Sequence, residues 1–251
     1  MNFVIEHLSK RFEDKVVLRD ICFTFTEGRI YGLLGRNGAG KTTLFNCLNR
    51  DLKADGGAFW LETDGRRSEV TADDIGYVLS TPTVPEFLTG REFLRFFLDI
   101  NEQKLPNPKS LDAYFDDMSI APEDRDKLMK DYSHGMKNKM QMLINIIAQP
   151  NILLLDEPTA QLDPIAAGNF LSTLQRLNRE LALTILLIEH RLEEAIPLAN
   201  KLLAMDNGRL IANDAVRPAV RALQGHPVLS SAMPVAARVA GMWQLPDCPL
   251  T

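Results

Sequence analysis

Apolar residues recur at every second position near the start of the chain, from position 21 to position 25, with polar or small residues between them. A period of two with one apolar side predicts a strand that buries one face. Strand-like segments recur at 57–62 and 74–80. The compact apolar segment 29–35 predicts another strand, which leads directly into a glycine-rich loop.

A helical period appears in three later segments. Residues 41–49 carry apolar side chains at helical spacing, and Met136 begins a longer segment with one apolar stripe. Asp163 followed by Pro164 is typical of a helix start, with an N-cap and a proline in the first position. We therefore predict helices after each of these points.

Two short apolar segments, at 152–155 and 183–188, predict strands that are buried on both faces. Asn207-Gly208 between two further apolar segments predicts a tight hairpin turn. Buried strands that alternate with helices indicate a parallel α/β sheet.

The middle of the chain differs from both ends. Residues from about 82 to 131 carry prolines, acidic side chains and an aromatic segment, which indicates an inserted helical subdomain. We favour a core position for Phe93, Phe96 and Phe97, and a groove for a partner helix is the alternative. The last 37 residues, from Ala215, hold five prolines and predict only short helices and loops.

Composition limits the classes of function. The chain has 251 residues, 45% hydrophobic and 24% charged, as ordinary globular proteins do. A net charge of −5 argues against general nucleic-acid binding. Three cysteines are too few and too scattered to predict a disulfide framework or a zinc site, so we expect a reducing, cytosolic setting. We see no targeting segment or membrane span, so a membrane process would need a pore from another chain.

A phosphate-binding motif follows the apolar segment 29–35. "GRNGAGKT", residues 35–42, matches G-x-x-x-x-G-K-[ST] and lies between a predicted strand and a predicted helix. In such a loop, backbone N–H groups cradle phosphates, Lys41 would neutralise the β- and γ-phosphates, and Thr42 would bind Mg²⁺. The strand-to-helix context disfavours the alternative of a glycine-rich turn without a ligand.

Two carboxylates end the apolar segment "ILLLDEP". An isolated carboxylate at the end of a buried strand is costly, and a magnesium ion beside Asp156 would remove that cost. Glu157 could polarise an attacking water; loop-facing charges are the alternative. His190 follows the next buried segment, and the strand ends of such a sheet share one edge, so we expect it beside Asp156.

A second anion site is indicated at "YSHGMKNKM", residues 132–140. Ser133 is a candidate N-cap, and Gly135 would let a ligand approach the backbone. Lys137 and Lys139 lie in the first turns, where the helix dipole disfavours positive charge. The segment is far in sequence from the phosphate-binding motif, so the phosphate that it would bind needs another source.

Together these motifs resemble the nucleotide-binding domain of ATP-binding cassette (ABC) transporters, over roughly residues 1–211. In order, "GRNGAGKTT" resembles the Walker A loop, "YSHGM" the signature, "ILLLDEP" Walker B, "AQLD" (160–163) the D-loop, and His190 the switch histidine. The resemblance implies an α/β P-loop NTPase (RecA-like) parallel sheet core with an N-terminal antiparallel β subdomain and an inserted helical subdomain. It divides the chain into an ABC-type domain at 1–214, with the insertion at about 82–150, and a C-terminal extension at 215–251.

The resemblance also implies the ligands and their residues. ATP would be held by residues of the Walker A loop: Gly35, Asn37, Gly38, Gly40, Lys41, Thr42 and Thr43. Mg²⁺ would be held by Thr42 and Asp156, with Glu157 as general base and His190 at the γ-phosphate. Two subunits of this family pair head to tail, so Ser133 and Gly135 would bind the γ-phosphate of the partner's ATP.

Three positions depart from the family pattern. His134 stands where the signature usually has a second glycine. Ser80 stands where the Q-loop glutamine would contact magnesium, and serine is shorter. Phe12 stands at the position of the adenine-stacking aromatic, which is more usually tyrosine, and it keeps the stacking face.

The two halves resemble different branches of the family. The front half, with "FLTGREFLRFF" and "YSHGMKNKMQML", resembles exporter-type subunits. The back half, from "AQLDPIAAG" to "IEHRLEEAIPLAN", resembles energy-coupling-factor importer ATPases, and the tail resembles them as well. A natural recombinant and a constructed chimera would both produce this pattern.

The resemblance implies a cytoplasmic ATPase subunit, peripheral on the inner face of the membrane, which drives a separate transmembrane permease. It would act as a homodimer or as a heterodimer with another ATP-binding subunit, without nucleic acid. The alternatives are an ABC ATPase that acts on ribosomes or DNA and a module that binds nucleotide without hydrolysis. A switch GTPase is disfavoured, because "NKMQ" lacks the aspartate that would recognise guanine.

Overall fold

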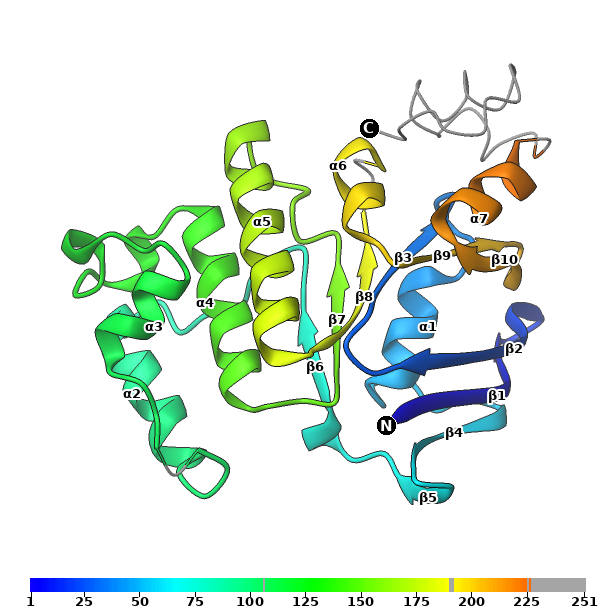
Figure 1. Cartoon of the computed structure of the whole chain (residues 1–251), viewed down its shortest axis with the longest axis horizontal. Helices are drawn as coiled ribbons and strands as arrows, with labels where there is room; N and C mark the ends of the chain where they lie inside the picture. Colours follow the sequence, from blue (N-terminus) through cyan, green and yellow to red (C-terminus); the bar gives the residue numbers. More distant parts are fainter. Residues whose placement is uncertain (106, 190–191, 225, 227–251) are drawn as a thin grey trace.

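The computed structural model describes residues 1–105, 107–189, 192–224 and 226. Two β-sheets and a helical layer make up this part of the chain (Figure 1). The first sheet is antiparallel and belongs to the N-terminal third. The second sheet is mostly parallel and carries the predicted nucleotide motifs at its strand ends.

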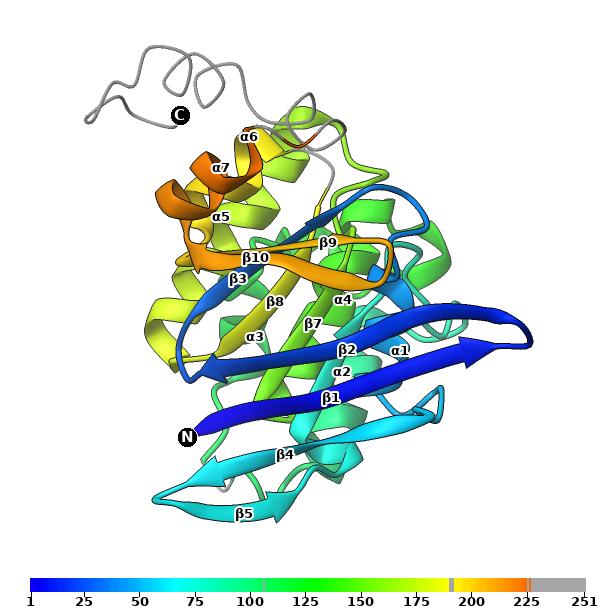
Figure 2. The ribbon, with the colours of Figure 1, turned by 90° about the vertical axis from the view of Figure 1, so that its right-hand side faces the viewer.

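The antiparallel sheet has the strand order β2-β1-β4-β5. Its strands are β1 (Asn2–Phe12), β2 (Lys15–Thr26), β4 (Gly56–Thr63) and β5 (Arg66–Glu69). Ile21 and Phe25 of β2 are buried and Cys22, Thr24 and Thr26 are exposed, which confirms the predicted period of two. The buried face of this sheet packs over one side of the second sheet (Figure 2).

The second sheet has the order β10-β9-β3-β8-β7-β6. Its strands are β3 (Ile30–Gly35), β6 (Ile75–Val78), β7 (Ile152–Asp156), β8 (Thr184–Ile188), β9 (Lys201–Asp206) and β10 (Arg209–Ala215). All pairs are parallel except β9 with β10, which form the predicted hairpin. Asn207 and Gly208 both have positive φ, 47° and 77°, as a type I′ turn requires.

Helices cover both faces of the second sheet. They are α1 (Lys41–Leu48), α2 (Gly90–Ile100), α3 (Leu111–Asp117), α4 (His134–Ile147), α5 (Pro164–Leu181), α6 (Leu192–Ala195) and α7 (Val216–Leu223). On β7, Leu153 and Leu155 pack into the core with α4 and α5. Ile152 and Leu154 point the other way, into the core with α1 and the antiparallel sheet. A strand buried on both faces explains the continuous apolar sequence of β7.

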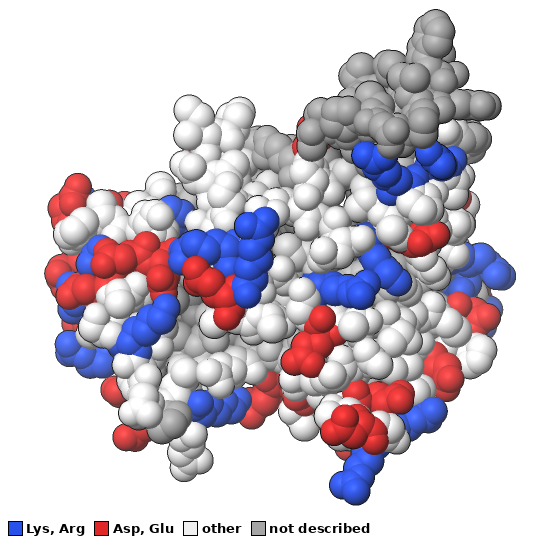
Figure 3. Space-filling view, viewed as in Figure 1, with Lys and Arg blue, Asp and Glu red and all other residues white. Residues whose placement is uncertain are grey.

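The helices α2, α3 and α4 all lie between β6 and β7 in the chain, where the helical subdomain was predicted. Phe93 is buried as expected, whereas Phe96 is 54% exposed because it lies on the outer side of α2. Charges of both signs alternate over this segment (Figure 3), and they include the ion pairs of Arg125 with Asp112 and Asp116. The domain boundaries at 82–150 and 214 stay predictions.

The described part of the C-terminal extension is a single short helix with its neighbouring residues. In α7, Ala219, Val220 and Leu223 pack against Leu202 of β9 and thereby cover one face of the sheet near its β10 end. Residues 227–251, which the sequence predicts as short helices and loops, lie outside the described part. Across the described helices, none combines the length and apolar character that a bilayer span requires.

Candidate functional site

The phosphate-binding loop joins β3 to α1 and has a backbone that favours glycine at two positions. Gly38 and Gly40 have φ of 81° and 105°, in the left-handed region. A Cβ on Gly40 would lie 3.0 Å from the carbonyl oxygen of Val17, and one on Gly35 would lie 2.7 Å from that of Met205. Gly40 is the N-cap of α1 and offers no side-chain hydrogen bond, so the first N–H groups of α1 stay available to an anion.

Lys41 is buried beside this loop with 7% of its surface exposed. Its ammonium donates hydrogen bonds to the carbonyl oxygens of Gly35, at 2.6 Å, and Arg36, at 3.3 Å. Burial lowers the pKa of Lys41, while Glu157 and Asp156 oppose that shift. A phosphate anion in the cradle would supply the negative charge that favours the ammonium form.

Asp156 ends β7 at the same edge of the sheet. Burial and the neighbouring Glu157 raise the pKa of Asp156. The hydroxyl of Thr42 in α1 hydrogen-bonds to this carboxylate and partly offsets the shift. A hydroxyl and a carboxylate brought together beside a phosphate cradle are suitable ligands for Mg²⁺, which prefers oxygen and would stabilise the ionised carboxylate.

Glu157 directly follows, in a left-handed backbone conformation with φ of 51°. Its N–H donates to the carbonyl oxygen of Ile188 at 3.0 Å, which ties the end of β7 to the end of β8. Glu189 is buried and accepts a hydrogen bond from the N–H of Thr159 at 2.9 Å. His190, the predicted γ-phosphate sensor, lies outside the described residues.

The signature segment, residues 132–136, begins α4. Ser133 caps the helix and its hydroxyl accepts from the N–H of Met136 at 3.2 Å, as predicted. A hollow of about 140 Å³ lies beside Ser133 and Gly135, and Leu162 and Phe170 line its other side. Gly135 keeps this hollow open, since a Cβ there would lie 3.3 Å from the side chain of Leu162.

The lysines of the signature helix are held in different ways. Lys137 forms an ion pair with Glu86 at 3.0 Å. Lys139 lines the hollow, donates to the carbonyl oxygen of Ser119 at 3.3 Å, and has its pKa lowered by burial. Among the described residues, the buried Nδ1 atom of His134 has no hydrogen-bond partner. The departure from glycine at 134 thus places an imidazole at the start of α4.

The phosphate loop and the signature helix lie on opposite sides of the mostly parallel sheet. Leu44, Phe45 and Leu48 of α1 belong to the core on the side of the antiparallel sheet. Met140 and Leu143 of α4 belong to the core on the other side. Figure 1 shows the same division, with α1 near the antiparallel strands and α4 in the helical layer. The two helix N-termini for which the sequence predicts phosphate binding therefore belong to helices on opposite faces of one sheet.

A family model described as "ABC transporter" matches residues 18–160, which is more than half of the chain. The chain belongs to the ABC transporter family. The matched segment contains the phosphate loop, the signature segment and Walker B with Glu157, in the order that the sequence predicted.

Relatives and solved structures of ABC proteins agree with this membership. A Bacillus cereus protein described as an ABC transporter ATP-binding protein is 31% identical over 260 residues, 95% of this chain and 44% of the relative. The bacitracin transport ATP-binding protein BcrA of Enterococcus faecalis is 33% identical over 217 residues, 84% of this chain and 69% of BcrA. The chain thus spans less than half the length of the Bacillus relative.

The fold matches a solved dimeric ATP-binding cassette in a post-hydrolysis state bound to ADP and phosphate. The TM-score is 0.70 at 17% identity, and the match covers 85% of this chain and 98% of that one. The predicted fold class, a P-loop NTPase of the ABC type, is confirmed by such neighbours. At this identity the likeness concerns the fold.

The structure also describes the remaining predicted site residues of this ABC cassette. Phe12 ends β1 with its ring 42% exposed and the ammonium of Lys10 5.2 Å from the ring centroid. Ser80 follows β6, at the sheet edge where β7 ends at Asp156. Asn37 is exposed in the loop and Thr43 is half-buried in α1. Their roles in nucleotide binding stay predictions.

Two residues that the sequence did not single out belong to the same region. The hydroxyl of Tyr77, on β6, lies 3.5 Å from Asp156 Oδ2 and 3.4 Å from Asn46 Oδ1. The pKa of Tyr77 is strongly raised. Burial of the hydroxyl is the largest cause, and the negative charge of Asp156 is the second. Asn138 of α4 is fully buried and donates to the carbonyl oxygen of Pro158 at 2.8 Å, which ties the signature helix to the loop after Glu157. No local signal in the sequence separates Asn138 from the other polar residues on that side of α4, Gln141 and Asn145.

Proposed function

We propose that this chain is the ATP-binding and ATP-hydrolysing subunit of an ABC transporter, and that it dimerises around two Mg-ATP. The observation that carries the proposal is the pair of phosphate-type sites on opposite sides of one sheet. In a head-to-tail dimer with two-fold symmetry, each phosphate loop faces the partner's signature helix. The solved dimeric cassette bound to ADP and phosphate supports such an assembly for this fold.

Within that dimer, the residues of the phosphate loop bind the nucleotide and the strand-end carboxylates carry out hydrolysis. Loop N–H groups and Lys41 hold the phosphates, and Thr42 and Asp156 hold Mg²⁺. Bound Mg²⁺ supplies charge neutralisation on the phosphate oxygens. Glu157 orients the attacking water and accepts its proton. The γ-phosphate role of His190 rests on the family resemblance alone, and Ser133 with Gly135 would bind the γ-phosphate of the partner's ATP.

Hydrolysis in this scheme acts as a switch. Loss of the γ-phosphate removes the contact between the two subunits and opens the dimer. The chain would transmit that motion to a separate transmembrane subunit, from a peripheral position on the cytoplasmic face of the membrane. The name of BcrA, a bacitracin transport protein, supports a transport role.

Substitution of Glu157 by Gln tests the hydrolytic role directly. The change keeps the size of the side chain and removes the general base, so we expect phosphate release to fall about 10²- to 10⁴-fold. Binding of a fluorescent ATP analogue should persist, since the phosphate loop is intact. Glu102→Gln, at an exposed carboxylate beyond α2, is the matched control and should hydrolyse ATP normally. Normal turnover in Glu157→Gln would refute the assigned role, and no phosphate release by the unmodified chain would favour a non-hydrolysing module.

A further inference from the structure

Two facing β-bulges account for the first two of the three register shifts in the pairing of β1 with β2. The register shifts by one residue between the pairs Ile5↔Phe23 and Leu8↔Ile21, and it shifts back before Lys10↔Leu18. The extra residues are His7 on β1 and Asp20 on β2, and both have positive φ, 54° and 59°. Because a bulge re-aims a side chain, both residues point to the exposed face of the sheet.

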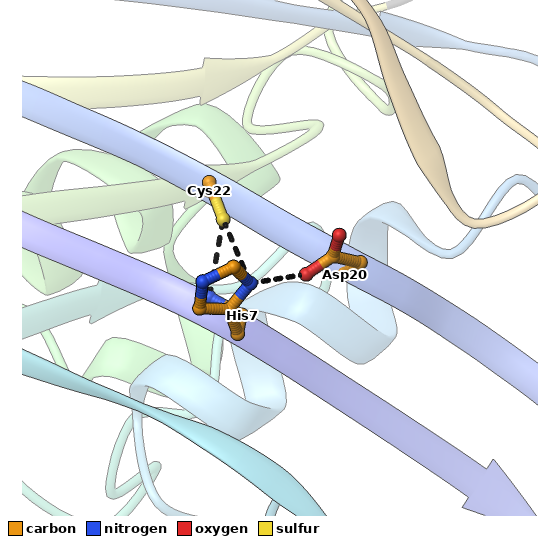
Figure 4. Close-up of side chains that lie close together, drawn as sticks. All are labelled: His7, Asp20 and Cys22. Carbon is orange, nitrogen blue, oxygen red and sulfur yellow. Dashed lines mark hydrogen bonds and ion pairs between the residues drawn. The ribbon is translucent and has the colours of Figure 1, made fainter.

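These bulges bring three potential metal ligands together (Figure 4). His7 Nδ1 lies 2.6 Å from Asp20 Oδ1 and 3.6 Å from Cys22 Sγ. The three ligand atoms all lie within 4.8 Å of one another. Cys22 is on the same outward face of β2 as Asp20, two residues further along. The cluster therefore comes from two adjacent strands that are fixed by backbone pairing.

The separations suit a tetrahedral metal of the size of zinc. With Zn–S of about 2.3 Å and Zn–N of about 2.0 Å, tetrahedral angles place sulfur and nitrogen about 3.5 Å apart. The distance from Cys22 Sγ to His7 Nδ1 is 3.6 Å. Nitrogen and oxygen ligands would lie about 3.4 Å apart, so the carboxylate of Asp20 would withdraw from His7 by less than about 1 Å. Asp20 is 62% exposed and has room for that shift.

A backbone hydrogen bond fixes the position of the Cys22 sulfur. The backbone N–H of His7 donates to Cys22 Sγ at 3.2 Å. The backbone of β4 passes close to the bulge at Gly57, where a Cβ would lie 2.3 Å from the carbonyl carbon of His7. Because Gly57 has no side chain, β4 passes beside His7 without displacing it. Cys22 and Asp20 are exposed to solvent.

We propose that His7, Asp20 and Cys22 form a three-ligand site for Zn²⁺ or a similar transition metal on the outer face of the antiparallel sheet. Imidazole, thiolate and carboxylate are the ligands that Zn²⁺ takes, whereas Mg²⁺ requires oxygen. The fourth position is open to water or to a donor from another molecule. The site uses a single cysteine, so cysteine spacing could not predict it. It is separate from the proposed ATP site and does not depend on it.

Cobalt titration of the full chain tests this site, because a Co²⁺ thiolate gives a charge-transfer absorption that oxygen ligands do not. The protein is stripped of metal, reduced, and freed of any polyhistidine tag. We expect the band to saturate at one equivalent of Co²⁺ and to disappear when Zn²⁺ is added. Cys22→Ser should abolish the band, and His7→Asn should weaken Co²⁺ binding tenfold or more.

Matched variants separate this site from other thiols and imidazoles. Cys248→Ser and His226→Asn should keep the band at full strength. Zn²⁺ should raise the melting temperature of the unmodified protein and leave that of Cys22→Ser unchanged, because a ligand that binds only the folded state stabilises it. Equal melting of the two proteins without metal shows that Cys22→Ser folds. No thiolate band in the unmodified protein, or a band that survives in Cys22→Ser, would overturn the proposal.

Discussion

The phosphate loop and the signature segment both lead into the N-terminus of a helix, but the charged side chains around the two helix starts differ. At the phosphate loop, Lys41 is buried and lies in the field of two carboxylates, Asp156 and Glu157, from a neighbouring strand. At the signature segment, Ser133 and Gly135 border a small hollow at the start of α4. Lys139 lines that hollow without a carboxylate partner among the described ion pairs.

This difference indicates what each region lacks. The phosphate loop has candidate metal ligands and a candidate base beside it, so in the proposed dimer it would need only the nucleotide. The signature segment has a helix N-terminus and a lysine beside its hollow but no pair of carboxylates like Asp156 and Glu157, so it suits a phosphate delivered by another molecule. Catalytic chemistry would therefore belong to one region and recognition across an interface to the other.

Gly135→Glu is expected to have the largest effect, because it would prevent the signature segment from binding a phosphate. A carboxylate in the first turn favours the helix dipole, so α4 should remain folded. The same charge would repel the partner's γ-phosphate, and like charges across an interface cost several kcal/mol, so we expect ATPase activity to fall about 100-fold or more. Steady-state phosphate release measures the loss. Unchanged activity in the folded variant would show that Gly135 faces no phosphate.

Asp156→Asn tests the other region, where a buried carboxylate lies beside the phosphate loop. Burial raises the pKa of Asp156, so the folded state without ligand holds the proton more tightly than the unfolded chain does. The resulting stability is present below the ordinary aspartate pKa and is lost as pH rises through the raised value. At neutral pH without Mg-ATP, Asp156→Asn should therefore melt at a higher temperature than the unmodified protein.

Calorimetric melting at several pH values measures this difference, which should shrink as the solution is acidified. Mg-ATP should then stabilise the unmodified protein more than the variant, because Asn is a poor ligand for Mg²⁺. A lower melting temperature for the variant at neutral pH would contradict the assigned desolvation of Asp156.

Ser133→Ala and Ser110→Ala form a matched pair with the smallest expected effect. Each serine caps a helix and accepts an N–H hydrogen bond of 3.2 Å, from Met136 and Ala113 respectively. Both variants should lose about 1 kcal/mol of stability in urea unfolding, as N-cap serines do. Only Ser133→Ala should also lose ATP-dependent dimerisation. Equal dimerisation of the two variants would show that Ser133 only caps α4 and does not bind the partner's nucleotide.

The sequence predicted most of the elements that position the phosphate loop. Periodicity and caps located β2, α4 and α5, and Asn207-Gly208 located the hairpin of β9 with β10, because these signals are local. The order of the strands and the separation of α1 from α4 by a sheet depend on long-range pairing, which no local pattern contains. The resemblance to ABC domains supplied that information instead.

Contacts between side chains from distant segments were beyond prediction. Tyr77 reaches Asp156 only because β6 pairs with β7. His7 and Asp20 meet only because two bulges compensate each other in register. Phe96 was expected in the core, but its position on α2 faces outward, since an aromatic segment longer than one buried stripe must expose some of its rings.

The mass of Glu157→Gln in solution, measured by light scattering with Mg-ATP and then with Mg-ADP, tests most directly whether the signature segment binds a phosphate across an interface. Blocked hydrolysis should hold the bound state, so we predict a dimer with Mg-ATP and a monomer with Mg-ADP. Adding Gly135→Glu should restore the monomer with Mg-ATP. A monomer in both nucleotides, with ATP shown to be bound, would contradict the assignment of the signature segment to a partner's nucleotide.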